Sequence, residues 1–281
     1  MIDSLLKSID KIPAFPATTQ KVVELLHDDD YVVNDVVNVI KYDQSVAANI
    51  LKISNSAYFG VRQKIKTIHD AVVYLGQQQL IRAVQTAGIS KYFRKGGQGY
   101  VAQSKDLWEH SVAVALMSQI LSRKLQSRED PVLYTAALLH DVGKIIMGEY
   151  VHQSFDQIIS RVRQLKCSFL EAEEAIIGIN HAELGGRIAT RWNFPAEIRD
   201  AIAFHHRPDL MVAESKTNAW LVYLSDQACL MYGIDGGIDG LAYQGLEEVM
   251  RYFNIQAIDL EKCFITLHDE LEIAKDLINI M

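Results

Sequence analysis

Apolar residues recur every three or four positions along most of this chain, which is the period of an α-helix. The pattern predicts helices over residues 18–27, 32–40 and 68–86. Another helix is expected to start at Asp43 and to end near Ser54, because Asn and Ser side chains compete for backbone hydrogen bonds. Alternation of the kind that marks a β-strand is scarce, so we expect an all-α fold.

The second half of the chain shows the same helical period. Its apolar stripes predict further helices around residues 107–121, 132–139, 181–192, 196–204 and 220–229. Asp130 and Pro131 are typical of a helix start, since Asp can cap backbone N–H groups and proline lacks the N–H that would stay unbonded there. Gly143 suits a left-handed turn just after the helix over 132–139.

Two glycine-rich segments indicate how the chain is divided. Residues 96–99 lead us to expect an N-terminal helical bundle region over 1–95 and a second helical region over 100–281. Residues 233–240 should separate a C-terminal helical tail from the rest of that second region. This segment is rich in Asp and Gly but lacks the residue order of an EF-hand calcium loop, so we interpret it as a plain loop.

Charge and cysteine content narrow the classes of partner. The chain has 281 residues, with 28 Lys and Arg against 35 Asp and Glu and a formal net charge of −7. We therefore expect no binding to nucleic acid or to an anionic membrane surface, which takes clustered basic residues. Cys167, Cys229 and Cys263 lack the spacing of a disulfide framework or zinc ribbon, which fits a reducing, cytoplasmic compartment. No apolar run suits a transmembrane helix, and the N-terminal residues include acids that a signal peptide lacks.

Histidine and acidic residues occupy apolar helix positions where a polar side chain requires an explanation. His110 shares a helical stripe with Leu107 and Val114, so we expect it to face inward. Similar positions, on apolar faces or at helix ends, are held by His140, Asp141, His181, His205, His206 and Asp226. A buried polar group without a partner costs about 2–7 kcal/mol. A metal ion would supply that partner.

Imidazole and carboxylate without thiolate suit one or two divalent ions of Fe, Mn, Zn, Co or Ni. Asp141 can serve one ion or bridge two, and two ions about 3.5–4 Å apart would activate a water and hold phosphoryl oxygens. Taken singly, His110 could be a hydrogen-bonded core histidine and Asp226 an ordinary acceptor. His205-His206 could be a favourable pair at a helix C-terminus. The ordered set, rather than any one member, favours a metal site.

Several blocks of the chain together resemble one known family. The order H…HD…D is the signature of the HD superfamily of metal-dependent phosphohydrolases, and its HDOD branch (HD-related output domain) is the closer match, over nearly the whole chain. The matching blocks are Ile12 to Pro16, Asp43 to Gly60, Ile65 to Gly76, Trp108 to Ser111, Leu138 to Lys144 and His181 to His206. The resemblance implies an HD-superfamily helical domain preceded by an N-terminal helical region.

The resemblance also implies roles for individual residues. The core metal ligands of the superfamily match His110, His140, Asp141 and Asp226, and the second-metal ligands of its HD-GYP relatives match His181, His205 and His206. Asp141 and Lys144 are the expected catalytic residues, Lys144 as a phosphate contact or electrostatic stabiliser. The alternative for Lys144 is a surface lysine at a helix end. Asp106, one helical turn before His110, is either a further ligand or a solvated acid at a helix start.

Two functions follow from this resemblance. The first is a bacterial signalling or regulatory protein that retains an HD-type metal site and binds a phosphorylated small molecule, a nucleotide or a signalling protein. The alternative is an active metal-dependent phosphohydrolase acting on a phosphomonoester, phosphodiester or nucleotide. HD-GYP enzymes that open cyclic di-GMP carry Glu after the double histidine and a nearby Gly-Tyr-Pro. Here Arg207 follows the double histidine and Gly-Tyr-Pro is absent, which argues against that reaction.

Overall fold

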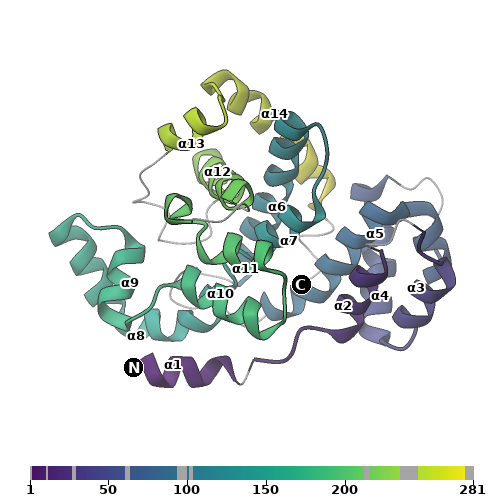
Figure 1. Ribbon diagram of the computed structural model, residues 1–281, viewed down its shortest axis with the longest axis horizontal. Coiled ribbons are helices and arrows are strands. Elements are labelled where there is room, and N and C mark those ends of the chain that lie inside the picture. Colours follow the sequence, from purple (N-terminus) through teal and green to yellow (C-terminus); the bar gives the residue numbers. More distant parts are fainter. Residues whose placement is uncertain are drawn as a thin grey trace. The chain divides into compact units, whose positions relative to one another are not determined.

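A computed structural model shows how the predicted helices are arranged (Figure 1). It describes residues 2–10, 12–26, 30–60, 64–93, 100, 104–211, 216–234 and 246–275. Within these ranges every regular element is a helix, so the all-α prediction is confirmed. No helix in the described ranges combines the length and apolar character needed to cross a bilayer.

The chain forms two compact units, each assembled from segments distant in sequence. One unit contains residues 1–12 and 92–268, and the other contains residues 13–91 and 269–281. The glycine-rich segment 96–99 lies outside the described residues. Most of residues 233–240, the segment interpreted as a plain loop rather than a calcium site, also lies outside them. The division into domains at residues 95 and 100 therefore stays a prediction.

The unit built mainly from residues 13–91 contains short helices and most of one long helix. They are α2 (Ala17–Leu26), α3 (Val33–Ile40), α4 (Gln44–Ser54), the 3₁₀ turn Ala57–Phe59 and α5 (Ile68–Phe93). Asp43 caps α4 as expected, because its Oδ1 accepts a hydrogen bond from the Val46 N–H at 3.1 Å. The helix predicted over 68–86 extends to Phe93, and a left-handed Gly76 (φ 68°) kinks it.

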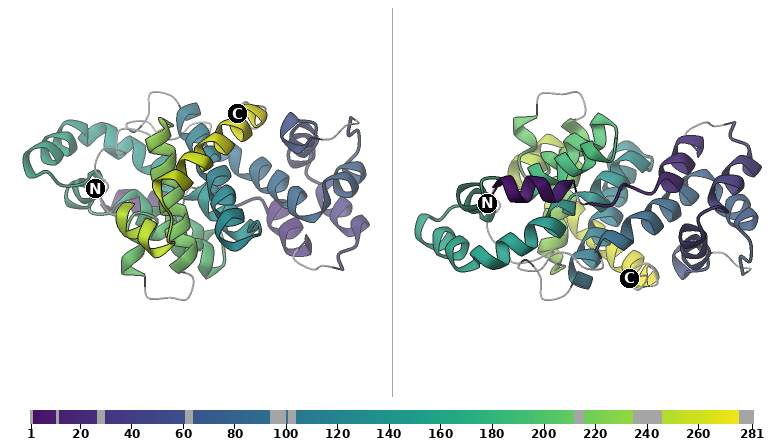
Figure 2. Two further views of the ribbon diagram at one scale, coloured as in Figure 1. Left: turned by 90° about the horizontal axis from the view of Figure 1, so that it is seen from above. Right: turned by 90° about the horizontal axis from the view of Figure 1, so that it is seen from below.

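The larger unit holds the remaining helices. They are α1 (Ile2–Ile9), α6 (Ser104–Gln126), α7 (Pro131–Leu139), α8 (Val142–Leu165), α9 (Phe169–Ile177), α10 (His181–Arg191), α11 (Ala196–Ala203), the 3₁₀ turn Pro208–Leu210, α12 (Lys216–Tyr232), α13 (Leu246–Tyr252) and most of α14 (Ala257–Ile273). α6 packs against α7 and α12, while α10 packs against α8 and α11 (Figure 1). The right-hand view in Figure 2, seen from below, shows α1 lying along α8.

Local sequence signals fix where the helices of this unit begin. Asp130 caps α7 by accepting from the Val132 N–H at 2.8 Å, and Pro131 is its first residue, as predicted. Asn180 caps α10 in the same way through the Glu183 N–H at 2.8 Å. Each cap satisfies a backbone donor that the helix itself cannot pair.

The left-handed turn expected at Gly143 is wrong, because this residue lies in the first turn of α8 without a positive φ. Its missing side chain serves close packing instead. A Cβ placed on Gly143 would lie 1.9 Å from the carbonyl oxygen of His181. The glycine thus lets the start of α8 approach the start of α10.

Candidate metal centre

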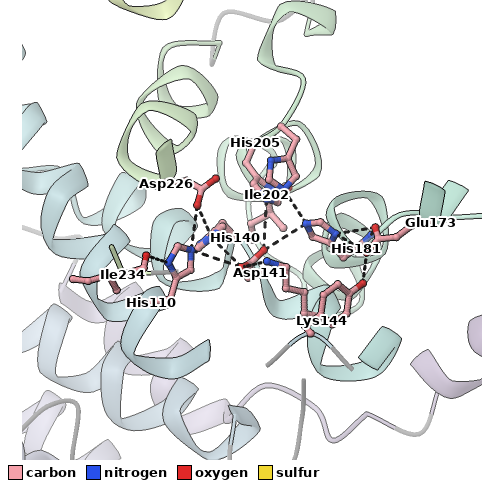
Figure 3. Close-up of polar contacts among 12 residues, drawn as sticks. His110, His140, Asp141, Lys144, Glu173, His181, Ile202, His205, Asp226 and Ile234 are labelled. Carbon is pink, nitrogen blue, oxygen red and sulfur yellow. Dashed lines mark hydrogen bonds and ion pairs between the residues drawn. The ribbon is translucent and has the colours of Figure 1, made fainter. Parts of the chain in front are cut away.

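The helix ends and inner faces of the larger unit bring the predicted ligands into one cluster of side chains, which we call the pocket (Figure 3). His110 comes from α6 and Asp226 from α12, while His140 and Asp141 form the turn between α7 and α8. His181 opens α10, and the double histidine follows the end of α11. Six of the side chains belong to residues that are at most 3% exposed, and only His206 is half-buried.

The first group of donor atoms lies on the α6 and α12 side of Asp141. The Nε2 atom of His110 is 3.1 Å from Asp226 Oδ1 and 3.9 Å from Asp141 Oδ2. The Nε2 atom of His140 is 3.3 Å from the same Asp141 oxygen and 4.0 Å from Asp226 Oδ1. We call these four residues the first donor group.

The second group faces the other oxygen of Asp141. The Nε2 atoms of His181 and His205 lie 3.6 and 3.7 Å from Asp141 Oδ1. The Nε2 atom of His206 is 2.8 Å from that of His181. Asp141, His181, His205 and His206, the second donor group, each offer a ligand atom, and these atoms all lie within 4.8 Å of one another. Asp141 belongs to both groups through different oxygens.

Hydrogen bonds at the far side of each ring determine which nitrogen faces the pocket. The Nδ1–H of His110 donates to the Ile234 carbonyl at 3.0 Å, and those of His140 and His205 donate to carbonyls three residues earlier, each at 2.7 Å. A carbonyl can only accept, so Nδ1 carries the proton. Each of these rings therefore directs Nε2 toward the other predicted ligands, and Nε2 is the nitrogen that a metal would bind once it is deprotonated.

Three inward-facing atoms have no hydrogen-bond partner in the described part of the chain. They are Nε2 of His140, Nε2 of His205 and Oδ1 of Asp141, and all three are buried. Leaving such groups without a partner is costly. A divalent cation in each donor group would satisfy them, and imidazole nitrogen with carboxylate oxygen is the donor set that suits transition metals. The residues present therefore fit the predicted metal.

Burial and neighbouring charges set the protonation of the pocket. Burial lowers the pKa of His205 to about 3 and also lowers that of His206, so both rings stay neutral at pH 7. Burial acts in the same direction on His140 and His181, but the Asp141 and Glu173 carboxylates beside them outweigh it and raise their pKa values. A metal entering the pocket must compete with protons at these two rings.

Comparison with known protein families identifies the family to which this chain belongs. The family model of the HDOD domain matches residues 12–208. The chain belongs to the HDOD family. A crystal structure of an HDOD domain protein of unknown function from Geobacter sulfurreducens is 25% identical, covers 100% of this chain and 97% of its own, and superposes with a TM-score of 0.80. A "Putative phosphohydrolase" from Shewanella amazonensis, 23% identical over 97% of both chains with a TM-score of 0.72, shares the fold.

Curated relatives of this HDOD chain are longer proteins. An uncharacterised protein of Treponema pallidum is 25% identical over 209 residues, which cover 72% of this chain and 39% of that protein. Ribonuclease Y of Deinococcus radiodurans is 30% identical over 118 residues, which cover 42% of this chain and 15% of the ribonuclease. The chain thus spans about two fifths of the first relative and less than a sixth of the second.

Lys144 lies inside the pocket, beside Asp141. The alternative prediction, that Lys144 is a surface lysine at a helix end, is therefore wrong. Lys144 is 3% exposed in the first turn of α8, and its Nζ donates to Asp141 Oδ2 at 2.6 Å. Together with His140, this cation holds the pKa of Asp141 well below its ordinary value despite burial. Asp106 differs, because it is half-buried in the first turn of α6 and belongs to neither donor group.

Glu173 was not among the predicted site residues, yet it supports the second donor group through His181. This carboxylate is fully buried in α9. It accepts from the Nδ1–H of His181 at 2.8 Å, from the His181 backbone N–H at 3.0 Å and from the Tyr100 hydroxyl. One signal was available, since Glu173 shares an apolar helix face with Phe169 and Ile177. Tyr100 follows the glycine-rich segment 96–99, and no helical pattern around it predicts a role in the site.

Proposed function

We propose that this chain is a regulatory HDOD protein of bacterial signalling whose pocket holds one or two divalent transition-metal ions and takes a phosphorylated ligand. The observation that carries the proposal is the convergence of three buried polar atoms with no hydrogen-bond partner among the described residues: His140 Nε2, His205 Nε2 and Asp141 Oδ1. The two donor groups described above would hold one ion each, with Asp141 shared.

The chain's own residues prepare the pocket for such a ligand. Carbonyl partners on Nδ1 orient His110, His140 and His205 before any ion arrives, and Glu173 does the same for His181. Ions held there would neutralise phosphoryl oxygens and make a bound water more acidic. Lys144, 2.6 Å from Asp141, places a further positive charge at the same point. In the regulatory role, the helices within residues 13–91 would contact a signalling protein as partner.

Metal-dependent phosphohydrolysis is the second candidate, and one specific observation favours it. The two oxygens of Asp141 face different histidine groups, with His140 Nε2 3.3 Å from Oδ2 and His181 Nε2 3.6 Å from Oδ1. A bridging carboxylate of this kind suits the paired ions that many phosphohydrolases use. Lys144 would then stabilise negative charge developing on the phosphoryl oxygens.

Metal analysis of the purified protein tests the pocket directly. We expect one or two equivalents of a transition metal in the wild type and almost none in His140→Ala or Asp141→Ala. His152→Ala is the matched control, because His152 is an exposed histidine of α8 and should leave the metal content unchanged. An Asp141→Ala variant that keeps the wild-type metal content would refute the proposed site.

A substrate screen separates the two candidates once the metal content is known. The metal-loaded protein is incubated with phosphomonoesters, phosphodiesters and nucleotides, and released phosphate or opened product is measured. Turnover that disappears in Asp141→Ala supports the hydrolase. Ligand binding without turnover, together with loss of the signalling output in Asp141→Ala, supports the regulatory role.

A further inference from the structure

One member of the second donor group reaches the surface of the protein, and it does so in a cleft. His206 is half-buried, whereas the other six predicted ligands are buried. The cleft beside it has a volume of about 260 Å³ and lies between the ends of α9, α10 and α11. A molecule in solution can therefore approach the second donor group at His206.

The walls of this cleft combine an apolar part with one paired cation. Leu170, Phe204 and Leu210 supply the apolar part. The cation is Arg207, directly after His206, whose Nη1 and Nη2 lie 3.0 and 3.4 Å from the two carboxylate oxygens of Glu174. Both side chains of this ion pair are about one-third exposed, at 36% and 35%. Water screens an ion pair this exposed, so it contributes little to stability and can exchange partners.

We propose that this cleft binds a phosphate monoester with an apolar or aromatic body, and that Arg207 exchanges Glu174 for the phosphoryl oxygens of the ligand. This proposal rests on the proposed function, since it names the class of phosphorylated ligand that the pocket takes. The apolar body lies against Phe204, Leu170 and Leu210, and the phosphoryl group faces His206 and the second donor group.

The chemistry of the guanidinium group favours a phosphate over other anions. Arg presents a planar fork of N–H donors that matches two phosphoryl oxygens, and such charge-assisted pairs are among the stronger hydrogen bonds. A phosphate monoester carries about −1.5 to −2 charge near pH 7, compared with the single charge of the Glu174 carboxylate. The ligand can therefore displace Glu174 from Arg207 at little cost.

Titration calorimetry with phenyl phosphate and with inorganic phosphate tests this cleft in the metal-loaded protein. We expect phenyl phosphate to bind the wild type more tightly than inorganic phosphate does. Arg207→Met should weaken both ligands about tenfold, because a charge-assisted pair is lost. Phe204→Ala should weaken phenyl phosphate alone.

Two charge-matched variants isolate the exchange of partners. Glu174→Gln removes the carboxylate that pairs with Arg207 and should tighten phenyl phosphate by about threefold. Glu183→Gln removes the same charge from the same cleft, but Glu183 pairs with Arg187 at 2.7 Å, so Arg207 stays paired and affinity should stay near the wild-type value.

Three outcomes would overturn the proposal: unchanged affinity in Arg207→Met, no phosphate binding by the metal-loaded wild type, or equal tightening in Glu174→Gln and Glu183→Gln. Metal content is measured on the same samples, and thermal unfolding confirms that each variant is folded. Normal metal content combined with any of these outcomes rejects the cleft while the proposed metal site stands. Absence of metal from the wild type rejects the proposed function itself.

Discussion

His205 is a buried ring whose protonation differs between the folded and the unfolded chain. Its folded pKa of about 3 lies below the ordinary value of 6.5, so the unfolded state binds the extra proton between these values. The stability contributed by neutral His205 is present above pH 6.5 and is lost as the pH falls toward 3. For the metal-free wild type we expect a loss of about 2 kcal/mol in the free energy of unfolding between pH 7 and pH 5 from this ring.

The variant His205→Asn isolates that contribution, because Asn lacks a titrating ring and its amide can still donate to the Ile202 carbonyl. Urea unfolding at pH 7 and pH 5 gives the two stabilities, and the difference between wild type and variant should shrink by about 2 kcal/mol at the lower pH. The raised pKa values of His140 and His181 act in the opposite direction in both proteins. A pH-independent difference would contradict the neutral buried ring.

Glu173 fixes the orientation of His181 without being a ligand itself. Glu173→Gln should weaken metal binding about tenfold, the loss typical when a histidine ligand loses its supporting carboxylate. Metal titration with a competing chelator measures the affinity. Tyr100→Phe is the milder comparison, since it removes one hydrogen bond to Glu173 and keeps the carboxylate. Equal affinities in wild type and Glu173→Gln would show that the carboxylate has no such role.

At the residue scale, the sequence was most informative where polarity conflicted with helical periodicity. His110 and Asp226 could be placed inside because their apolar neighbours on the helix needed burial, and the structure confirms that both are buried. Lys144 was harder to place, because a lysine after a helix end is ordinary on a surface and only the nearby Asp141 explains its burial. Glu173 obeyed the same rule as His110, but a single Glu among several in a helix does not stand out.

At the scale of elements, the close approach of α8 and α10 depends on Gly143. Gly143→Ala would place a methyl group 1.9 Å from the His181 carbonyl oxygen, so the two helices must move apart. We expect a loss of at least about 2 kcal/mol in the free energy of unfolding, together with weaker metal binding. Chemical unfolding and metal titration measure the two effects.

Gln153→Ala provides the control for that substitution, since it introduces alanine at an exposed position of the same helix. It should change stability by no more than about 0.5 kcal/mol. If Gly143→Ala were as stable as Gln153→Ala and bound metal normally, the tight contact between α8 and α10 would have no importance for the site.

The first residues of α4 and α7 were predicted accurately from the sequence. Asp43 and Asp130 carry their information locally, because a capping side chain bonds a backbone N–H two or three residues later. Gly143 was misinterpreted because glycine is compatible with both a left-handed turn and a tight helix contact. Only the position of His181, 38 residues later in the chain, distinguishes the two, and local sequence does not contain it.

At the scale of the whole molecule, the candidate site joins helices from distant parts of the chain. The first donor group connects α6 with α12, and the second connects α8 with α10 and the end of α11. A bound ion therefore cross-links the larger unit and should stabilise it. With free metal at about 100 times its dissociation constant, the gain is about 2.7 kcal/mol, or a rise of about 5–10 °C in Tm.

Removing the ion with EDTA should reverse this gain in the wild type. Differential scanning calorimetry before and after chelation measures the change in Tm. His140→Ala supplies the comparison, because a protein that holds no ion should show the same Tm in both conditions. A wild type whose Tm does not respond to EDTA or to added metal would argue against an ion that links these helices.

The convergence of these helices could not be derived from helical periodicity alone. Periodicity shows which face of each helix is buried, but it does not show which buried faces meet. The resemblance to the HDOD family supplied that step, and the structure brings all of the predicted ligands into one pocket. The contribution of Glu173 and the cleft beside His206 depend on three-dimensional packing, so neither followed from the order of motifs.

The order of the ligands along the chain has a consequence for synthesis on the ribosome. The second donor group is complete once His206 has emerged, whereas the first waits for Asp226, 20 residues later. At typical translation speeds this interval is about one to four seconds. During translation, all ligands of the histidine-rich second donor group thus emerge before the first donor group is complete.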